Sequence, residues 1–197
     1  MANKPEAKVK KLPTVVQLKE ELEREKYKKR FRKAFLSTVY SLIIVAAVAV
    51  LIATLALPVM EISGSSMEPT LSDKEIVLLI KTTKLDCGEL ICFSYQNKLL
   101  IKRVIAKGGD TVNIDDMGFV SVNGAAVNEP YVTERAKGDG DVSFPYTVPN
   151  DRYFVMGDRR TVSVDSRNSV IGAIEKDQIV GKIMFRIWPL DKIGRVG

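Results

Sequence analysis

The feature that most constrains this chain is an apolar run of 23 residues, Phe35 to Leu57, that contains no charged side chain. As a helix, such a run is about 35 Å long, which is enough to cross the hydrocarbon core of a bilayer. It is longer than the apolar part of a cleaved signal peptide, and a charged segment of 33 residues precedes it. A buried core helix is the alternative, but no other segment reads as a helix that could cover it. The sequence therefore predicts a single transmembrane helix over residues 34–57.

The net charge of +6 is concentrated before this run. Residues 1–33 contain 12 Lys and Arg against 5 Asp and Glu, whereas the rest of the chain contains 18 against 19. Segments rich in Lys and Arg stay on the cytoplasmic side, next to the anionic inner leaflet. We therefore expect residues 1–33 to be a basic cytoplasmic tail with a juxtamembrane helix, and residues 58–197 to lie outside the plasma membrane. The folded part has no basic excess, which argues against a nucleic-acid partner.

After Pro58 the sequence changes to short runs of alternating or β-rich residues that are separated by turn signals. The predicted strands are 75–80, 90–95, 99–106, 110–114, 118–122, 152–158 and 178–188. Residues 133–151, rich in Gly, Pro and polar side chains, are predicted to form a long loop or an inserted excursion. This pattern predicts a mostly β protein, in which one all-β domain follows the transmembrane helix.

The residue types that are missing narrow the chemistry. The chain contains no histidine, so a Ser-His-Asp triad and a Cys-His dyad are impossible. Cys87 and Cys92 are too few for a disulfide scaffold, and a zinc site is not expected. We therefore expect no metal and no cofactor. A nucleophilic serine in this chain would need a lysine or a carboxylate as its base.

Two stretches could supply such a pair. "GSSMEPTL" contains Ser65 and Ser66, and "LLIKRVIA" contains Lys102 among apolar residues. Burial lowers the pKa of a lysine and can make it a base. The alternative is a lysine on an edge strand that prevents aggregation, and the pattern alone favours that reading. Pro69 stands three residues after Ser66, so any Ser–Lys pair must be assembled by the fold rather than by a Ser-x-x-Lys motif.

A third stretch, "GDRRTVSVDSR" from residue 157 to residue 167, alternates acidic and basic side chains. An exposed loop of ion pairs with little energetic value is one interpretation. The other is a set of side chains that fixes the geometry of a neighbouring site.

Taken together and in this order, these stretches resemble the bacterial type I signal peptidases of the short, Gram-positive type. The resemblance covers about residues 35–197, with the apolar anchor followed by the motifs "GSSMEPTL", "CGELICF", "IKRVIAKGGD", "VNGAAVNEPYV" and "YFVMGDRRTVSVDSR". It implies a membrane-bound endopeptidase that removes signal peptides from exported preproteins after small residues. The partners that it implies are such preproteins and the lipid bilayer.

The resemblance also implies roles for individual residues. Ser66 matches the nucleophile and Lys102 the general base, which replaces the edge-strand interpretation of that lysine. Ser163 matches a serine whose hydroxyl bonds the lysine amine. The remaining matches are supporting residues, namely the ion pair of Asp165 with Arg167, and Asp158, which would act through Arg103.

Three positions depart from the family pattern, of which one, Glu89 in place of a common Asp, is a neutral exchange. Some members have a serine at the position of Gly64 that contributes to the oxyanion hole, so here the Ser66 amide would be the main donor. The usual Asn of the last motif is Arg159.

Three alternatives stay open at this point. A Ser–Lys autoprotease of the repressor type would carry a DNA-binding domain where this chain has its apolar run. A membrane-anchored β-domain without activity would usually have lost Ser66 or Lys102. A specialised peptidase with dedicated substrates would show the same motifs. The sequence does not define the oligomeric state or a role for either cysteine.

Overall fold

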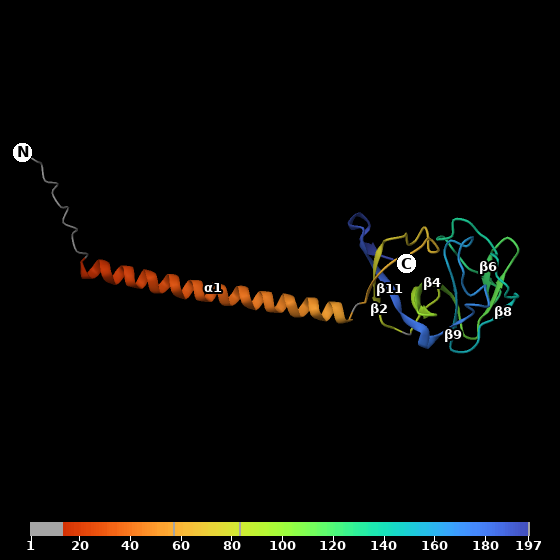
Figure 1. Cartoon of the computed structure of the whole chain (residues 1–197), viewed down its shortest axis with the longest axis horizontal. Coiled ribbons are helices and arrows are strands. Elements are labelled where there is room, and N and C mark those ends of the chain that lie inside the picture. The colour runs from red at the N-terminus through yellow and green to blue at the C-terminus, as the bar shows by residue number, and fades with distance from the viewer. Residues whose placement is uncertain (1–13, 57, 83, 197) are drawn as a thin grey trace, which may run out of the picture. The chain divides into compact units, whose positions relative to one another are not determined.

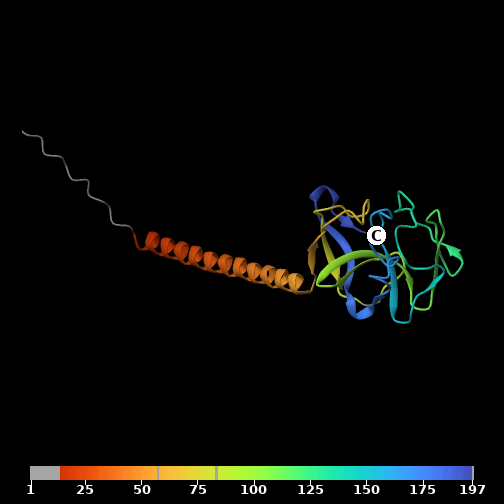
Figure 2. The same ribbon diagram turned by 45° about the vertical axis from the view of Figure 1, so that its right-hand side comes forward.

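A computed structural model describes residues 14–56, 58–82 and 84–196. Its contacts divide the chain into two units, Met1–Ile52 and Ala53–Gly197. The described part of the first unit is helical, and the second unit takes up the end of this helix and all of the strands (Figures 1 and 2). This arrangement is the predicted fold class.

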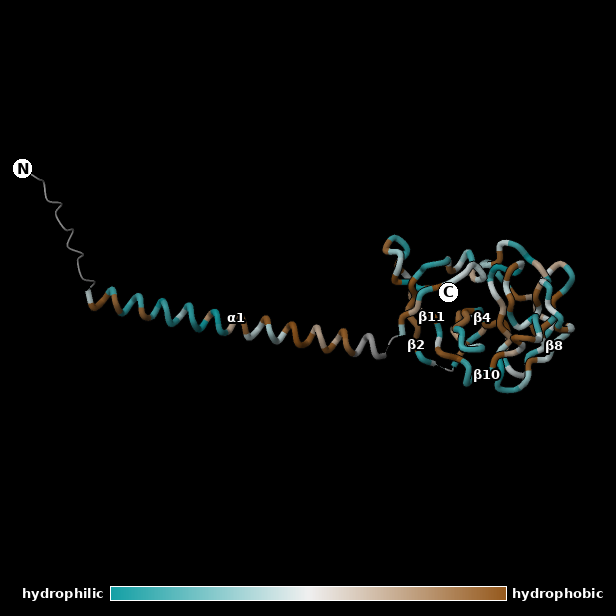
Figure 3. The backbone as a smooth tube through the Cα atoms, in the orientation of Figure 1, coloured by the Kyte–Doolittle hydropathy of each residue, from teal (hydrophilic) through white to brown (hydrophobic). Residues whose placement is uncertain are grey.

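The helix, α1 (Val15–Ala56), is continuous and crosses the predicted boundary between residues 33 and 34 without a break. It begins at a capping contact, in which the Gln17 side chain accepts a hydrogen bond from the Thr14 amide at 3.1 Å. Figure 3 shows a hydrophilic first half and a hydrophobic second half. The helix is long and apolar enough to cross a membrane, and the apolar window is not buried within the chain. The alternative of a buried core helix is therefore wrong.

The larger sheet has the strand order β1-β2-β11-β3-β4-β9-β10, with β12 paired to β11, and all of its pairings are antiparallel. Its strands are β1 (Val59–Glu61), β2 (Ile76–Ile80), β3 (Leu90–Tyr95), β4 (Lys98–Lys107), β9 (Arg152–Met156), β10 (Ile174–Glu175), β11 (Ile179–Trp188) and β12 (Gly194–Arg195). Two short 3₁₀ helices flank β11, η1 (Lys176–Gln178) and η2 (Leu190–Lys192).

The smaller sheet has the order β7-β6-β5-β8. Its strands are β5 (Thr111–Ile114), β6 (Val120–Val122), β7 (Ala125–Ala126) and β8 (Tyr146–Thr147). A core that includes Val112, Ile114 and Val120 packs this sheet against Phe154 of β9. The two sheets therefore belong to one β-domain.

All seven predicted strands are present, with ends that differ by at most two residues. Within the predicted long loop 133–151 the only strand is β8, which is two residues long. β4 lies between β3 and β9, but β9 pairs with it only from Arg103 onward, so residues 98–102 keep one unpaired edge. The Lys102 side chain is buried, whereas a lysine that protects a sheet edge from aggregation is exposed to solvent, so its burial needs another explanation.

Candidate active site

Ser66 and Lys102 lie side by side. Lys102 Nζ donates a hydrogen bond to Ser66 Oγ at 2.8 Å, although 36 residues separate them in the chain. Lys102 stands in the middle of β4, opposite Ile91 of β3. Ser66 lies in the turn that follows β1. The fold thus assembles the Ser–Lys pair that no local motif provides.

The turn that carries Ser66 is fixed by its own backbone and by a neighbouring loop. The buried side chain of Met67 anchors it in the core, and the Met67 carbonyl accepts a bond from the Leu71 amide at 2.9 Å. The Ser66 carbonyl accepts a bond from the Arg159 amide at 3.1 Å. Because both contacts act on the backbone, the Ser66 hydroxyl stays available to Lys102.

The environment of Lys102 favours a neutral amine. The side chain is only 4% exposed, and burial lowers its pKa from 10.5 to about 8. The negative charge of Asp165 raises the pKa and the positive charge of Arg167 lowers it, so burial remains the dominant cause. A lysine with this pKa can accept a proton near neutral pH, as a general base must.

The Ser66 amide is available as an oxyanion donor. Among the described residues, it donates no hydrogen bond. The left-handed backbone of Gly64, at φ +96°, and the bond from its amide to Asp73 Oδ1 at 2.8 Å shape the chain just before it. A free backbone donor beside the nucleophile is what stabilisation of a tetrahedral oxyanion requires.

Asp158 and Arg103 form a buried bidentate ion pair behind the lysine. Arg103 donates from Nε to Asp158 Oδ1 at 2.8 Å and from Nη2 to Oδ2 at 2.6 Å. Thr70 also donates to Asp158, which joins the pair to the turn that carries Ser66. The ring of Tyr131 stacks on the Arg103 guanidinium at 3.8 Å. Because Arg103 follows Lys102 on β4, this network fixes the strand next to the base.

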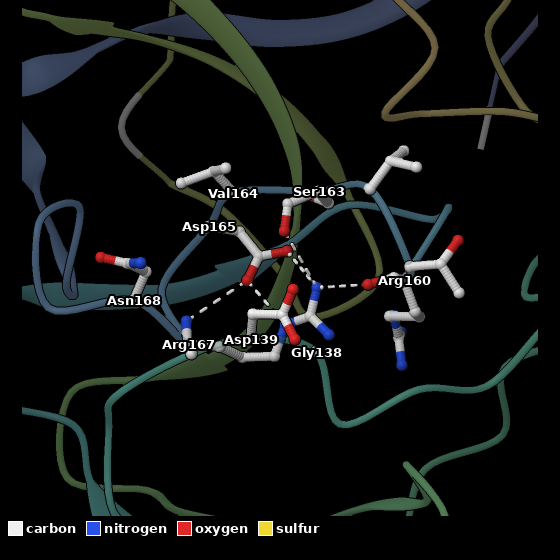
Figure 4. A pocket seen from close by; sticks show the side chains of 11 residues that line it. Gly138, Asp139, Arg160, Ser163, Val164, Asp165, Arg167 and Asn168 are labelled. Carbon is white, nitrogen blue, oxygen red and sulfur yellow. Dashed lines mark hydrogen bonds and ion pairs between the residues drawn. The ribbon is translucent and has the colours of Figure 1, made fainter.

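Asp165 and Arg167 form a second buried bidentate pair, shown in Figure 4. Arg167 donates from Nε to Asp165 Oδ1 at 2.8 Å and from Nη2 to Oδ2 at 2.9 Å. Burial raises the pKa of the Asp165 carboxyl, but the hydrogen bond and charge of Arg167 outweigh it and hold the pKa below its ordinary value. Asp165 therefore stays ionised and also accepts a bond from the Gly157 amide at 2.9 Å. Through these contacts Asp165 links Gly157 and Arg167, the two ends of the loop of residues 157–167.

Ser163 lies close to the pair but does not make the bond that the resemblance implies. Its hydroxyl is buried and has no hydrogen-bond partner among the described residues. The hydroxyl approaches Asp165 closely enough to help lower the pKa of that carboxyl, without complete hydrogen-bond geometry. A Cβ atom on Gly157 would lie 2.2 Å from Ser163 Oγ and 2.7 Å from the Ser66 carbonyl oxygen. Ser163 is therefore beside the site, but its bond to Lys102 is absent here.

The sequence analysis did not identify the buried pair of Glu129 and Arg160. Arg160 donates from Nη1 to Glu129 Oε2 at 3.2 Å and from Nε to the Gly157 carbonyl at 3.1 Å, and both side chains are fully buried. The motif "VNGAAVNEPYV" contains Glu129, but nothing in its pattern shows where the carboxylate points. This pair is a third anchor of the loop that begins at Gly157.

A groove of about 360 Å³ leads to the pair. Its walls are the segment before Ser66 and the segment before Lys102, comprising Met60, Glu61, Ile62, Ser63, Gly64, Ser66, Met67, Leu99, Leu100, Ile101 and Lys102. β3 pairs with all of β4 up to Arg103, whereas β9 pairs with β4 only from Arg103 onward. One edge of residues 98–102 is thus open along the groove.

The cysteines lie apart from this geometry. Cys87 is exposed and Cys92 is buried in the core, and neither forms a disulfide. Burial raises the pKa of the Cys92 thiol to about 12, which makes it unreactive. In the part of the chain that the structure describes, no cluster of three acidic or cysteine side chains could hold a metal ion.

The chain is similar in sequence to known proteins. The family described as signal peptidase, peptidase S26, matches residues 35–188. Signal peptidase I of Bacillus amyloliquefaciens is 37% identical over 182 residues, which cover 87% of this chain and 96% of that protein. Signal peptidase IB of Staphylococcus aureus strain Mu50 is 37% identical over 151 residues, which cover 66% of this chain and 78% of that protein. A signal peptidase I of known structure from Enterococcus faecalis V583 aligns with 50% of this chain and 96% of its own, at 25% identity and a TM-score of 0.42.

The chain combines an N-terminal helix with an all-β domain, in which a serine is hydrogen-bonded to a buried lysine. Such a pair can support acyl transfer without histidine. The chain belongs to the signal peptidase family, peptidase S26, on the strength of the matches in sequence. It is a serine endopeptidase.

Proposed function

We propose that this protein is a membrane-bound endopeptidase that cleaves signal peptides from exported preproteins, with Ser66 as the nucleophile and Lys102 as the general base. The observation that carries the proposal is the 2.8 Å contact between Lys102 Nζ and Ser66 Oγ, made by a lysine whose pKa is about 8. The family match supports the cleavage of signal peptides.

The chemistry follows from the positions of these groups. Neutral Lys102 accepts the proton of the Ser66 hydroxyl while Ser66 Oγ bonds to the carbonyl carbon of the scissile peptide. The free amide of Ser66 donates to the resulting oxyanion. The lysine ammonium then gives its proton to the leaving amine as the C–N bond breaks. In the second half, Lys102 takes a proton from water, the hydroxide attacks the ester, and Ser66 regains its proton.

The groove suggests how the signal peptide binds. The residues before the scissile bond would lie extended between residues 60–64 and residues 99–101, and would pair with the open edge of β4. The apolar side chains that line the groove favour small apolar residues, the A-x-A pattern that precedes signal-peptide cleavage sites. Adding a strand fixes the scissile carbonyl at the end of the groove, beside Ser66.

We further propose that α1 anchors the enzyme in the plasma membrane as a single span, with the lipid bilayer as its partner. The excess of Lys and Arg in residues 1–33 supports a cytoplasmic position of that end and an outer position of the β-domain. Exported preproteins present their cleavage sites on that outer side. The anchor would thus keep the catalytic groove where its substrate emerges.

The test is cleavage of a purified preprotein by the full chain in detergent micelles or lipid. We expect Ser66→Ala to abolish turnover, and Lys102→Ala to lower kcat/KM by about 100- to 10,000-fold, because the general base is lost. Ser65→Ala and Lys98→Ala are matched controls, since Ser65 is the neighbouring serine and Lys98 an exposed lysine of the same strand. If either Ser66→Ala or Lys102→Ala cleaved like the wild type, the proposed dyad would be wrong.

A further inference from the structure

An exposed ion pair stands immediately beside the nucleophile. Glu68 follows Ser66 by two residues, and the Arg159 amide donates to the Ser66 carbonyl at 3.1 Å. Arg159 Nη1 and Glu68 Oε2 are 2.8 Å apart. The two side chains are 44% and 36% exposed, unlike the other arginine pairs of this loop, which are buried. Two opposite charges thus face solvent on the two backbone segments that border Ser66.

The groove determines which part of a substrate could meet these charges. Its lining extends from Met60 to Ser66 and Met67 on one wall, and ends at Lys102 on the other. The residues before the scissile bond fill this groove, so the chain after the bond must leave on the far side of Ser66. Glu68 and Arg159 lie on the backbone that borders Ser66, outside the groove lining. An extended chain advances about 3.3 Å per residue, so the first two or three residues of the mature protein would pass them.

We propose that the ion pair of Glu68 and Arg159, called the rim below, contacts the first residues of the mature chain. Because its two charges offset each other, the enzyme accepts either a positive or a negative side chain there. This inference rests on the proposed function. Each charge of the rim is offset by its partner at 2.8 Å, so a passing charged side chain meets a dipole instead of a net charge. Removal of one partner leaves a full charge beside the path of the leaving chain.

Arg159 stands at the position where the motif that this chain resembles usually has Asn. An exposed ion pair contributes little to stability. The alternative is that the pair only holds the Ser66 turn against the loop of Arg159. In that case its loss would slow the cleavage of every substrate by the same factor.

The test compares three preproteins that differ only in the second residue of the mature part, which is Glu, Gln or Lys. For the full chain in detergent, kcat/KM is measured with the wild type, Arg159→Gln, Glu68→Gln and the double variant. We expect a wild-type Lys-to-Glu ratio within about twofold of one. Arg159→Gln should raise the ratio about two- to fivefold and Glu68→Gln should lower it equally, because exposed charge pairs are weak. The double variant should return the ratio towards one.

Arg152 and Glu175 provide the matched control, since they form another exposed Arg–Glu pair on β9 and β10, 42% and 54% exposed. Arg152→Gln and Glu175→Gln should leave the ratio unchanged. High salt should compress the ratios of the single Glu68 and Arg159 variants. A wild-type ratio far from one, or single variants that share the wild-type ratio, would overturn the proposal. If the wild type failed to cleave the Gln preprotein, the proposed function itself would be wrong.

Discussion

At the scale of single residues, the site depends on the charge state of Lys102. The amine donates to an uncharged oxygen, and burial rather than a cationic neighbour is the main reason for its lowered pKa. The negative charges of Asp165 and Asp158 raise the pKa of the amine. The balance leaves the amine protonated in most molecules at pH 7 and neutral in most at pH 9.

The first prediction concerns the rate as a function of pH. Because the base is active only when neutral, kcat/KM should rise about tenfold per pH unit below pH 8 and level off above it. The measurement is preprotein cleavage between pH 6 and pH 10 with the wild type. A profile that is flat over this range would exclude Lys102 as the base.

The second prediction concerns stability. The folded pKa of Lys102, about 8, is below the ordinary 10.5, so between these values the unfolded chain binds more protons than the folded one. The cost of burying the ammonium is therefore full below pH 8 and is relieved as the pH rises towards 10.5. Lys102→Met, which carries no ammonium, should lack this dependence. The unfolding free energy of the variant relative to wild type should therefore be greater below pH 8 than at pH 10.5, by about 3 kcal/mol at most.

The readout is the difference in unfolding free energy between wild type and Lys102→Met from pH 7 to pH 10.5. The difference is needed because burial raises the pKa values of Cys92 and Tyr131 to about 12. These two groups lower the unfolding free energy as the pH rises, and they do so in both proteins. A difference that does not change with pH would contradict the lowered pKa of the lysine.

At the scale of elements, three buried arginines make hydrogen bonds that fix the loop from Gly157 to Arg167. Arg103 of β4 donates to Asp158. Arg160 donates to Glu129 and to the Gly157 carbonyl, and Arg167 donates to Asp165. Buried ion pairs add little net stability, but the loss of one partner leaves an uncompensated charge. The loop is thus fixed in the one position that brings Gly157 against Ser66.

The third prediction tests that contact. Gly157→Ala would place a Cβ atom 2.7 Å from the Ser66 carbonyl oxygen and 2.2 Å from Ser163 Oγ, so the Ser66 turn and the loop of Gly157 must move apart. We expect a loss of about 100-fold in kcat, as small displacements of reacting groups cost this much, and a destabilisation of about 1–3 kcal/mol. Cleavage kinetics and Tm provide the measurement. Gly194→Ala is the control, since no atom lies within 4 Å of its Cβ position. Wild-type kinetics in Gly157→Ala would show that the contact does not position Ser66.

The strands were predictable because each one alternates or concentrates apolar residues between turn signals, a property of the local sequence. The position of β4 in the sheet could not be predicted, because an isolated lysine in an apolar strand is compatible with an edge strand as well as with a buried site. Ser66 and Lys102 followed from resemblance in order and spacing. Glu129 and the unpaired hydroxyl of Ser163 depend on side-chain directions between segments far apart in sequence, which no local pattern encodes.

At the scale of the whole molecule, an apolar helix and a β-domain of nearly balanced charge share one chain. The excess of Lys and Arg over Asp and Glu is confined to residues 1–33, and the described part of this segment forms the hydrophilic half of α1 (Figure 3). This division of charge and hydropathy is the basis of the proposed orientation in the membrane.

The fourth prediction tests that orientation with a natural probe. Cys87 is exposed, so a membrane-impermeant thiol reagent should label it on intact cells, and Cys87→Ser should abolish the label. Burial raises the pKa of the Cys87 thiol, so the labelling is best done at mildly alkaline pH. Val16→Cys, made in the Cys87→Ser background, should react only after the membrane is opened. Labelling of Val16→Cys on intact cells would reverse the proposed topology.

The unbroken course of α1 has a mechanical consequence. Residues 15–33 continue the apolar span as one rod, about 28 Å long at 1.5 Å per residue. Transmembrane helices lean by about 20° on average, and the lean changes with bilayer thickness. At that angle the free end of the rod is displaced sideways by about 10 Å. If α1 spans the bilayer as proposed, the helix would act as a lever that converts a small change in the thickness of the bilayer into a large excursion of its charged end.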